Sequence, residues 1–145
     1  MNANELRIGN KFECMGMIQT VFELCDNTNR GEIKQVGYEY IIRCEENENQ
    51  YKPIEINPIP LTEEWLLRFG FTKGNVCYKR GYSMDILKTD FYLRPSYSGG
   101  FYWGFNISDE KMDCELNDVR AIEYIHQLQN LIFAITGEEL KINLS

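Results

Sequence analysis

The sequence predicts an α+β fold: antiparallel β-sheet with one short helix and one long C-terminal helix packed on it. Three patterns carry this prediction. Apolar and polar residues alternate in the first third of the chain, as half-buried strands require. A short segment with helix-capping residues precedes an aromatic-rich stretch. A helical repeat of apolar residues then runs from Val119 to Thr136 without Gly or Pro.

The first 52 residues are expected to be β-rich. The pair Gly9-Asn10 favours a turn. The segment Ile18–Leu24 alternates apolar and polar residues, and Tyr38–Ile42 does so again after the loop-like run Asp26–Gly31. Small open barrels begin with this order of elements: a strand, a turn, a second strand, a long loop and a third strand. This part is therefore expected to resemble half of an SH3-like barrel.

A proline-rich connector follows at Pro53–Pro60, which holds three prolines in eight residues. Proline fixes φ and favours extended geometry in the residue before it. We therefore expect a single domain over residues 1–145 with three subregions: a β-rich part (1–52), the connector (53–60) and a helix–meander–helix part (61–145).

A short helix is expected over 63–69. Thr62 is a good N-cap because its hydroxyl can accept a free backbone N–H. Glu63 and Glu64 lie in the first turn, where the helix dipole favours negative charge. Gly70 suits the left-handed position that ends a helix.

The aromatic-rich stretch is expected to form an antiparallel meander. Its four strands are predicted at 76–79, 82–87, 90–94 and 101–107, with a turn near Arg80-Gly81.

The long helix is expected to be capped by Asn117 or Asp118 and to end at Gly137. After Leu131 it is apolar nearly all round, which predicts buried C-terminal turns. His126, the single histidine, lies off the main apolar stripe and is expected at the surface or at its boundary. A short last strand is predicted at 140–144.

The composition is that of an acidic globular protein. The 145 residues carry a net charge of −7, with 43% hydrophobic and 26% charged residues. The five cysteines have long spacings without a CxxC pair, which argues against a disulfide framework or a zinc knuckle. The chain lacks a signal-peptide pattern and an 18-residue apolar run, so a cytoplasmic protein without membrane contact is expected.

The sequence offers little sign of catalysis. It has no nucleotide-binding glycine loop, GxSxG or HExxH pattern. The run Asp26–Gly31 has Asp and Gly at the first and sixth positions of a calcium loop but lacks the other ligands. We therefore expect no catalytic residues, metal site or cofactor, although an uncharacterised enzyme stays an alternative.

Three segments resemble a family of small uncharacterised proteins found in bacteria, phages and mobile elements. They are LRIGN (Leu6–Asn10), IPLTEEWLLRFGF (Ile59–Phe71) and YIHQLQNLIFAITGEEL (Tyr124–Leu140). The resemblance implies a cytoplasmic accessory protein of phage or mobile-element origin. It brings no catalytic or binding residue, because the family has no assigned activity.

The charge is unevenly distributed. Residues 1–60 carry −4, residues 61–107 carry +2 and residues 108–145 carry −5. The basic middle holds 12 of the 19 aromatic residues. Cations beside aromatic rings are typical of single-stranded nucleic-acid binding, and the candidate residues are Lys79, Arg80, Tyr82, Arg94 and Tyr97.

The overall acidity opposes binding to a polyanion. The function expected first is therefore a non-enzymatic protein–protein interaction or accessory module with an unknown protein partner. Binding of single-stranded nucleic acid by the central sheet is the alternative.

Overall fold

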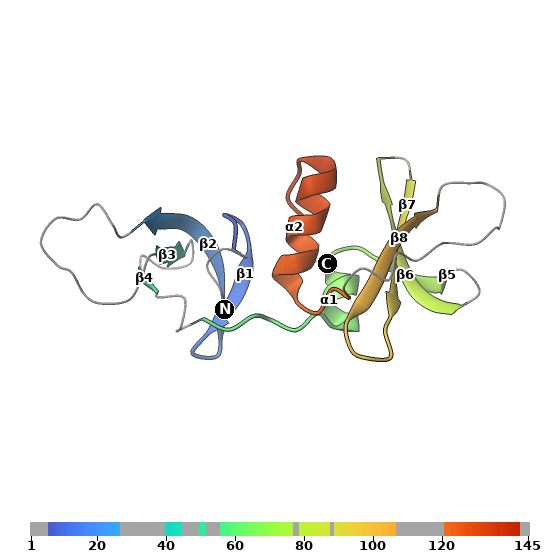
Figure 1. The fold of residues 1–145 in the computed structure, drawn as a ribbon, viewed down its shortest axis with the longest axis horizontal. Helices are drawn as coiled ribbons and strands as arrows, with labels where there is room; N and C mark the ends of the chain where they lie inside the picture. Colours follow the sequence, from blue (N-terminus) through green and yellow to red (C-terminus); the bar gives the residue numbers. More distant parts are fainter. Residues whose placement is uncertain are drawn as a thin grey trace, which may run out of the picture. The chain divides into compact units, whose positions relative to one another are not determined.

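The computed structural model describes residues 6–26, 40–44, 50–51, 56–76, 79–87, 89–106 and 121–142. Within these ranges it contains two four-stranded antiparallel sheets, one short helix and one later helix (Figure 1). The α+β prediction is confirmed. The chain divides into two compact units: unit 1 comprises Met1–Ile59 and Ile125–Asn130, and unit 2 comprises Pro60–Tyr124 and Leu131–Ser145. The boundary after Ile59 falls inside the predicted proline connector.

The sheet of unit 1 has the order β1-β2-β3-β4, with β1 (Lys11–Cys14), β2 (Met17–Asp26), β3 (Tyr40–Cys44) and β4 (Gln50–Tyr51). A two-residue turn, Met15-Gly16, joins β1 to β2 with φ of 53° and 78°. Positive φ at both positions is the type I′ geometry whose twist matches antiparallel strands. The first residue of the predicted loop Asp26–Gly31 is the last residue of β2, and residues 27–31 lie outside the described part of the structure.

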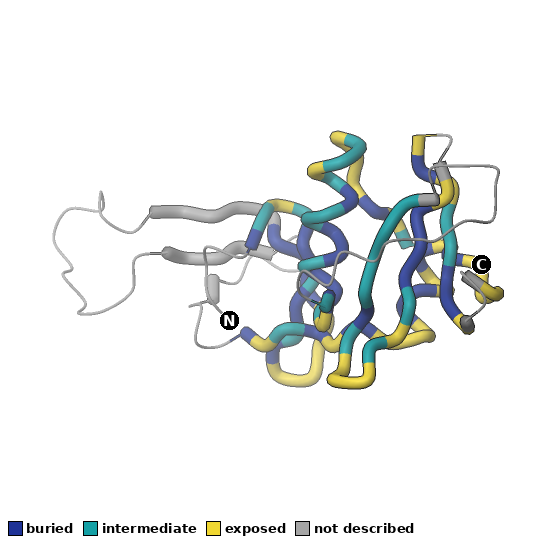
Figure 2. The backbone as a smooth tube through the Cα atoms, turned by 45° about the vertical axis from the view of Figure 1, so that its right-hand side comes forward, coloured by how far each residue is buried: buried dark blue, intermediate teal, exposed yellow. Residues whose placement is uncertain are grey.

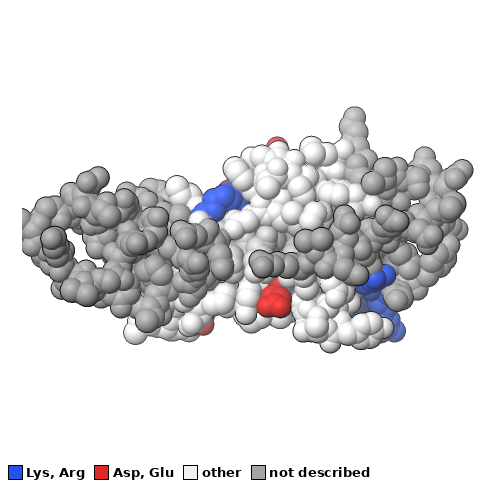
Figure 3. Space-filling view, viewed as in Figure 1, with Lys and Arg blue, Asp and Glu red and all other residues white. Residues whose placement is uncertain are grey.

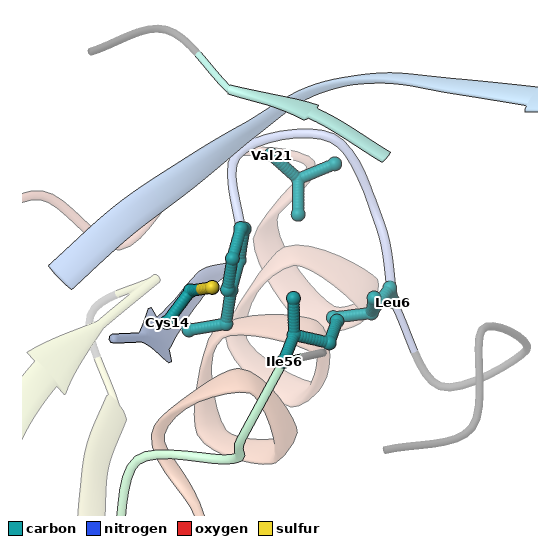
Figure 4. Close-up of a cluster of buried hydrophobic side chains, with 5 residues drawn as sticks. Leu6, Cys14, Val21 and Ile56 are labelled. Atoms are coloured by element: carbon teal, nitrogen blue, oxygen red, sulfur yellow. The ribbon is translucent and has the colours of Figure 1, made fainter. Parts of the chain in front are cut away.

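Five buried apolar residues form the core of unit 1 (Figure 4): Leu6, Phe12, Cys14, Val21 and Ile56. The outer edge of β1 is closed by the connector, because Glu13 and Asn57 exchange two backbone hydrogen bonds of 2.9 and 2.8 Å. The extended geometry predicted for the proline-rich stretch is what allows this pairing.

Helix α1 (Glu63–Arg68) opens the main part of unit 2, as predicted. Thr62 Oγ1 accepts the Trp65 backbone N–H at 3.5 Å. At the other end Gly70 has a φ of 88°, and the Phe71 N–H donates to the Leu66 carbonyl at 3.0 Å. Both ends of the helix are therefore closed by the residues that the sequence indicated.

The sheet of unit 2 is a meander in the order β5-β6-β7-β8, with β5 (Thr72–Val76), β6 (Lys79–Ile86), β7 (Thr89–Pro95) and β8 (Phe101–Asn106). The last three strands match the prediction closely. The first predicted strand, at 76–79, was wrong, and so was the turn near Arg80-Gly81. Both residues lie inside β6, and Gly81 pairs with Gly74 of β5. Two glycines facing each other are tolerated within a ladder, so Gly81 does not mark a turn.

The inner strand β7 is buried on both faces of this sheet, since Phe91, Tyr92 and Leu93 are each at most 2% exposed. Figure 2 shows the buried stretches of backbone, with exposed residues mostly at turns. On one face Phe91 contacts the rings of Phe71 and Phe105, with centroid distances of 6.1 and 5.3 Å. Most of the aromatic residues that made the middle of the chain unusual therefore build the core of unit 2.

Helix α2 (Ile125–Thr136) ends at Gly137 as predicted but begins six residues later than Val119. Ile122 and Tyr124 instead form single β-bridges with Phe101 and Pro60. The first helical N–H, that of Ile125, donates to the Ile59 carbonyl at 3.0 Å. This N–H is thus satisfied by the connector, and the predicted capping residues Asn117 and Asp118 lie outside the described residues.

Two expectations about burial within α2 were wrong. The most buried part of the helix is its first half, where Ile125, His126, Leu128 and Gln129 are at most 2% exposed, whereas Ala134 is exposed. His126 is therefore a buried residue and not a surface one. The strand predicted at 140–144 is also absent over the described residues 140–142, which are irregular.

Candidate interaction surface

The strand register of unit 2 decides which of the five candidate residues share a surface. Tyr82 lies opposite Leu93, and Leu93 lies opposite Trp103, so these three side chains share one face of the sheet. Side chains alternate between faces along a strand. Arg80 is therefore on the Tyr82 face and Arg94 is on the opposite face. Lys79 begins β6, but its side chain is outside the described part of the structure.

Tyr82 serves as a structural residue. It is 6% exposed, and its ring packs edge-on against Phe101 at a centroid distance of 5.9 Å. Its hydroxyl donates to Glu63 Oε2 at 2.7 Å, and Glu63 Oε1 also pairs with Lys73 Nζ at 2.5 Å. Burial, with help from the Glu63 carboxylate, raises the pKa of Tyr82 to about 12. The Tyr82 ring thus ties α1 to the sheet and has no free face for a nucleic-acid base.

Arg94 and Tyr97 lie at one end of the β7–β8 hairpin, together with a residue that the sequence reasoning missed. The register pairs Arg94 directly with Tyr102 across the two strands, and both side chains are half-buried. Tyr97 is at the apex of the connecting loop and is fully exposed, with a relative exposure of 103%. We call these three residues the hairpin-end surface.

The loop that carries Tyr97 is held by its own hydrogen bonds. The Ser96 N–H donates to the Gly100 carbonyl at 3.0 Å, and the Ser98 N–H donates to Ser96 Oγ at 3.2 Å. The hydroxyls of Ser96 and Ser98 are 2.8 Å apart. Gly100 has a φ of 71°, and a Cβ there would lie 2.7 Å from the Ile122 carbonyl oxygen, so only glycine fits. Tyr97 is therefore exposed on a backbone with a defined conformation.

The surroundings of the hairpin-end surface carry mixed charge. Glu123 is exposed, and its Cγ would lie 3.0 Å from a Cβ at Gly100, which places a carboxylate side chain beside the loop. On the face shown in Figure 3, the described Lys and Arg side chains are isolated groups without a continuous basic patch. Extended contact with phosphates usually requires several adjacent cations.

The residues that the structure describes also bear on metal binding and on membrane crossing. There, no three His, Cys, Asp or Glu side chains gather closely enough to hold a metal ion. No helix in the same ranges is long and apolar enough to cross a bilayer. Cys14 is a buried residue in the core of unit 1.

The comparisons with known proteins add no relatives. No family model, no curated protein and no solved structure matches the chain. The resemblance of its three segments to small phage and bacterial proteins therefore stays a prediction.

Proposed function

We propose that this chain is a non-enzymatic interaction module that binds a protein partner through Arg94, Tyr97 and Tyr102. The observation that carries the proposal is the full exposure of Tyr97 on a loop fixed by internal hydrogen bonds. Tyrosine and arginine dominate the energetic centres of protein interfaces. A tyrosine on a defined backbone also loses little conformational entropy when it binds.

Single-stranded nucleic acid is the alternative ligand for the same surface. Tyr97 and Tyr102 could stack on bases while Arg94 contacts a phosphate. Three observations favour a protein instead: Tyr82 is buried, Arg80 lies on the other face of the sheet, and Glu123 lies beside the loop. The cytoplasmic location and the phage or mobile-element origin remain part of the proposal.

A site-specific photo-crosslinker tests the proposal. Benzoylphenylalanine is introduced in place of Tyr97 and, as a matched control, in place of Leu87, a residue of the β6–β7 turn that is 69% exposed. In cells of the native host we expect a protease-sensitive adduct of one discrete mass from position 97 and none from position 87. Arg94→Ala and Tyr102→Ala should each reduce the yield of this adduct about tenfold, the effect of a loss of about 1.4 kcal/mol at an interface centre.

The other outcomes separate the two ligands. An adduct that nuclease removes and protease does not would replace the protein partner by nucleic acid. Titration with fluorescent single-stranded DNA and RNA at low salt checks this outcome independently, because the phosphate contribution is then largest. Absence of any adduct at position 97, or equal adducts at both positions, would contradict the proposal.

A further inference from the structure

Strand β5 is an open edge of the sheet in unit 2. It is the first strand in the order β5-β6-β7-β8, so only β6 pairs with it among the described residues. Thr72, Lys73, Gly74 and Asn75 are all exposed. An edge strand presents a row of backbone N–H and C=O groups that can pair with another strand.

The devices that usually protect an edge are weak here. β5 contains no proline, and its register with β6 runs from Thr72 to Val76 without a bulge. Its one charged residue, Lys73, lies on the same face as Tyr82 and pairs with Glu63 Oε1 at 2.5 Å, so its charge is directed across the sheet face. A Cβ at Gly74 would have no neighbour within 4 Å, which leaves the middle of the strand open.

We infer that β5 pairs antiparallel with β5 of a second copy of this chain and joins two sheets into one. If all five residues of β5 pair with the other copy, the twofold axis that relates the two copies must pass through the position of Gly74. In this register Gly74 faces its own equivalent, and Lys73 faces Asn75 of the other copy. The pairing therefore avoids opposing the two lysines, which would be destabilising. This inference is independent of the hairpin-end surface and goes beyond the proposed function.

The charge at position 75 tests the pairing. In the proposed dimer, residue 75 of each copy faces Lys73 of the other. Asn75→Glu therefore creates two pairs of opposite charge, whereas Asn75→Lys creates two pairs of like charge. Two cross-strand pairs of ordinary strength tighten or weaken the dimer dissociation constant roughly two- to thirtyfold. Sedimentation equilibrium of the full chain measures this constant, and thermal melting of dilute protein checks that each monomer is folded. Leu87→Glu and Leu87→Lys are the matched controls and should leave it unchanged.

A cysteine substitution tests the register itself. Facing Cα atoms of antiparallel strands are about 4.5–5.5 Å apart, which is within the range that a disulfide spans. Gly74→Cys should therefore form a reducible covalent dimer under mild oxidation, while the unsubstituted chain and Thr72→Cys should not.

The inference is wrong if the chain is monomeric at every concentration, or if Asn75→Glu and Asn75→Lys change the dissociation constant in the same direction. Equal crosslinking of Gly74→Cys and Thr72→Cys also contradicts it. Tyr97→Ala should leave the dimer intact, so failure of the dimer and failure of the proposed function can be distinguished.

Discussion

The side-chain amide of Gln129 in α2 holds the backbone next to Lys11 at the start of β1. Gln129 Oε1 accepts the Lys11 N–H at 2.9 Å, and Gln129 Nε2 donates to the Gly9 carbonyl at 3.1 Å. Gln129 is 2% exposed, and both of its hydrogen bonds are partly buried. One polar residue of the helix thus satisfies a donor and an acceptor of the turn that precedes the sheet.

Gln129→Ala should lower the free energy of unfolding of unit 1 by about 2 kcal/mol, because it removes the hydrogen-bond partner of a partly buried N–H and of a partly buried carbonyl. Urea unfolding followed by circular dichroism measures the loss. Glu138→Gln, at an exposed side chain, is the control and should change little. Equal effects of the two substitutions would show that the Gln129 amide contributes nothing to stability.

Tyr92→Phe should stabilise the protein by about 1 kcal/mol, because it removes a polar group that is buried without compensation. Tyr92 is 2% exposed, and its hydroxyl has no hydrogen-bond partner among the residues that the structure describes. Tyr102→Phe, at a half-buried tyrosine of the neighbouring strand, is the matched control and should be nearly neutral. A melting temperature that falls with Tyr92→Phe would contradict the prediction.

Gly104→Ala should destabilise unit 2 by about 2 kcal/mol through overpacking. A Cβ at this position would lie 2.5 Å from Cζ of Tyr92, whose ring crosses the backbone of β8 there. Gly74→Ala is the matched control, since it also adds one methyl group to a strand but has no atom within 4 Å. Thermal unfolding of the two variants should therefore differ clearly, and equal melting temperatures would argue against the close contact.

The Glu63–Tyr82 hydrogen bond should make the stability of unit 2 depend on pH at both extremes. The pKa of Tyr82 is raised from 10.0 to about 12, so its contribution is complete below pH 10 and is lost as the pH rises to 12. The pKa of Glu63 is lowered below 4.5 by its hydrogen bonds to Lys73 and Tyr82, so its contribution is present above pH 4.5 and is lost on acidification.

Denaturant midpoints measured across the pH range test this dependence. Tyr82→Phe should reduce the loss of stability at alkaline pH, and Glu63→Gln should reduce the loss of stability at acid pH. In an ultraviolet titration of the folded protein, Tyr82 should ionise with a pKa of about 12, above the ordinary tyrosine value of 10.0. If Tyr82→Phe loses as much stability at alkaline pH as the unsubstituted protein, another group causes that loss.

Met15→Asn should stabilise the β1–β2 hairpin by about 0.5–1 kcal/mol, because asparagine tolerates the left-handed conformation of this turn position better than methionine. Met15 has a φ of 53° and is 87% exposed, so the substitution sacrifices no packing. Met17→Asn is the control, since Met17 lies in a strand where asparagine is unfavourable. A gain from both substitutions would point to general removal of exposed apolar surface instead of a turn effect.

Local signals in the sequence were sufficient for the elements whose ends are set by their own residues. Thr62 and Gly70 delimit α1, and Gly137 ends α2, because capping depends on side chains within one turn of the helix. The start of α2 depends on the Ile59 carbonyl, which is distant in the sequence, and this is why the helix was predicted too long. A turn was wrongly predicted at Gly81, because the local residue pattern does not show that Gly81 pairs with Gly74 of β5.

The candidate surface was predictable in part. Arg94 and Tyr97 follow from composition, and Tyr102 could have been found by pairing residues symmetrically about the Ser96–Gly100 loop. The burial of Tyr82 could not be predicted, because the sequence does not show which aromatic residues of a strand face the core until the strand register is known.

The residues of unit 1 are interrupted in the chain by most of unit 2. Synthesis on the ribosome proceeds from the N-terminus, so β1 and β2 emerge more than a hundred residues before Gln129. The backbone at Gly9 and Lys11 therefore lacks its partner until α2 has been made, whereas β5–β8 are complete earlier and pair between neighbours in sequence. The order of translation thus favours the meander as the first part of the nascent chain to fold and the N-terminal sheet as the last.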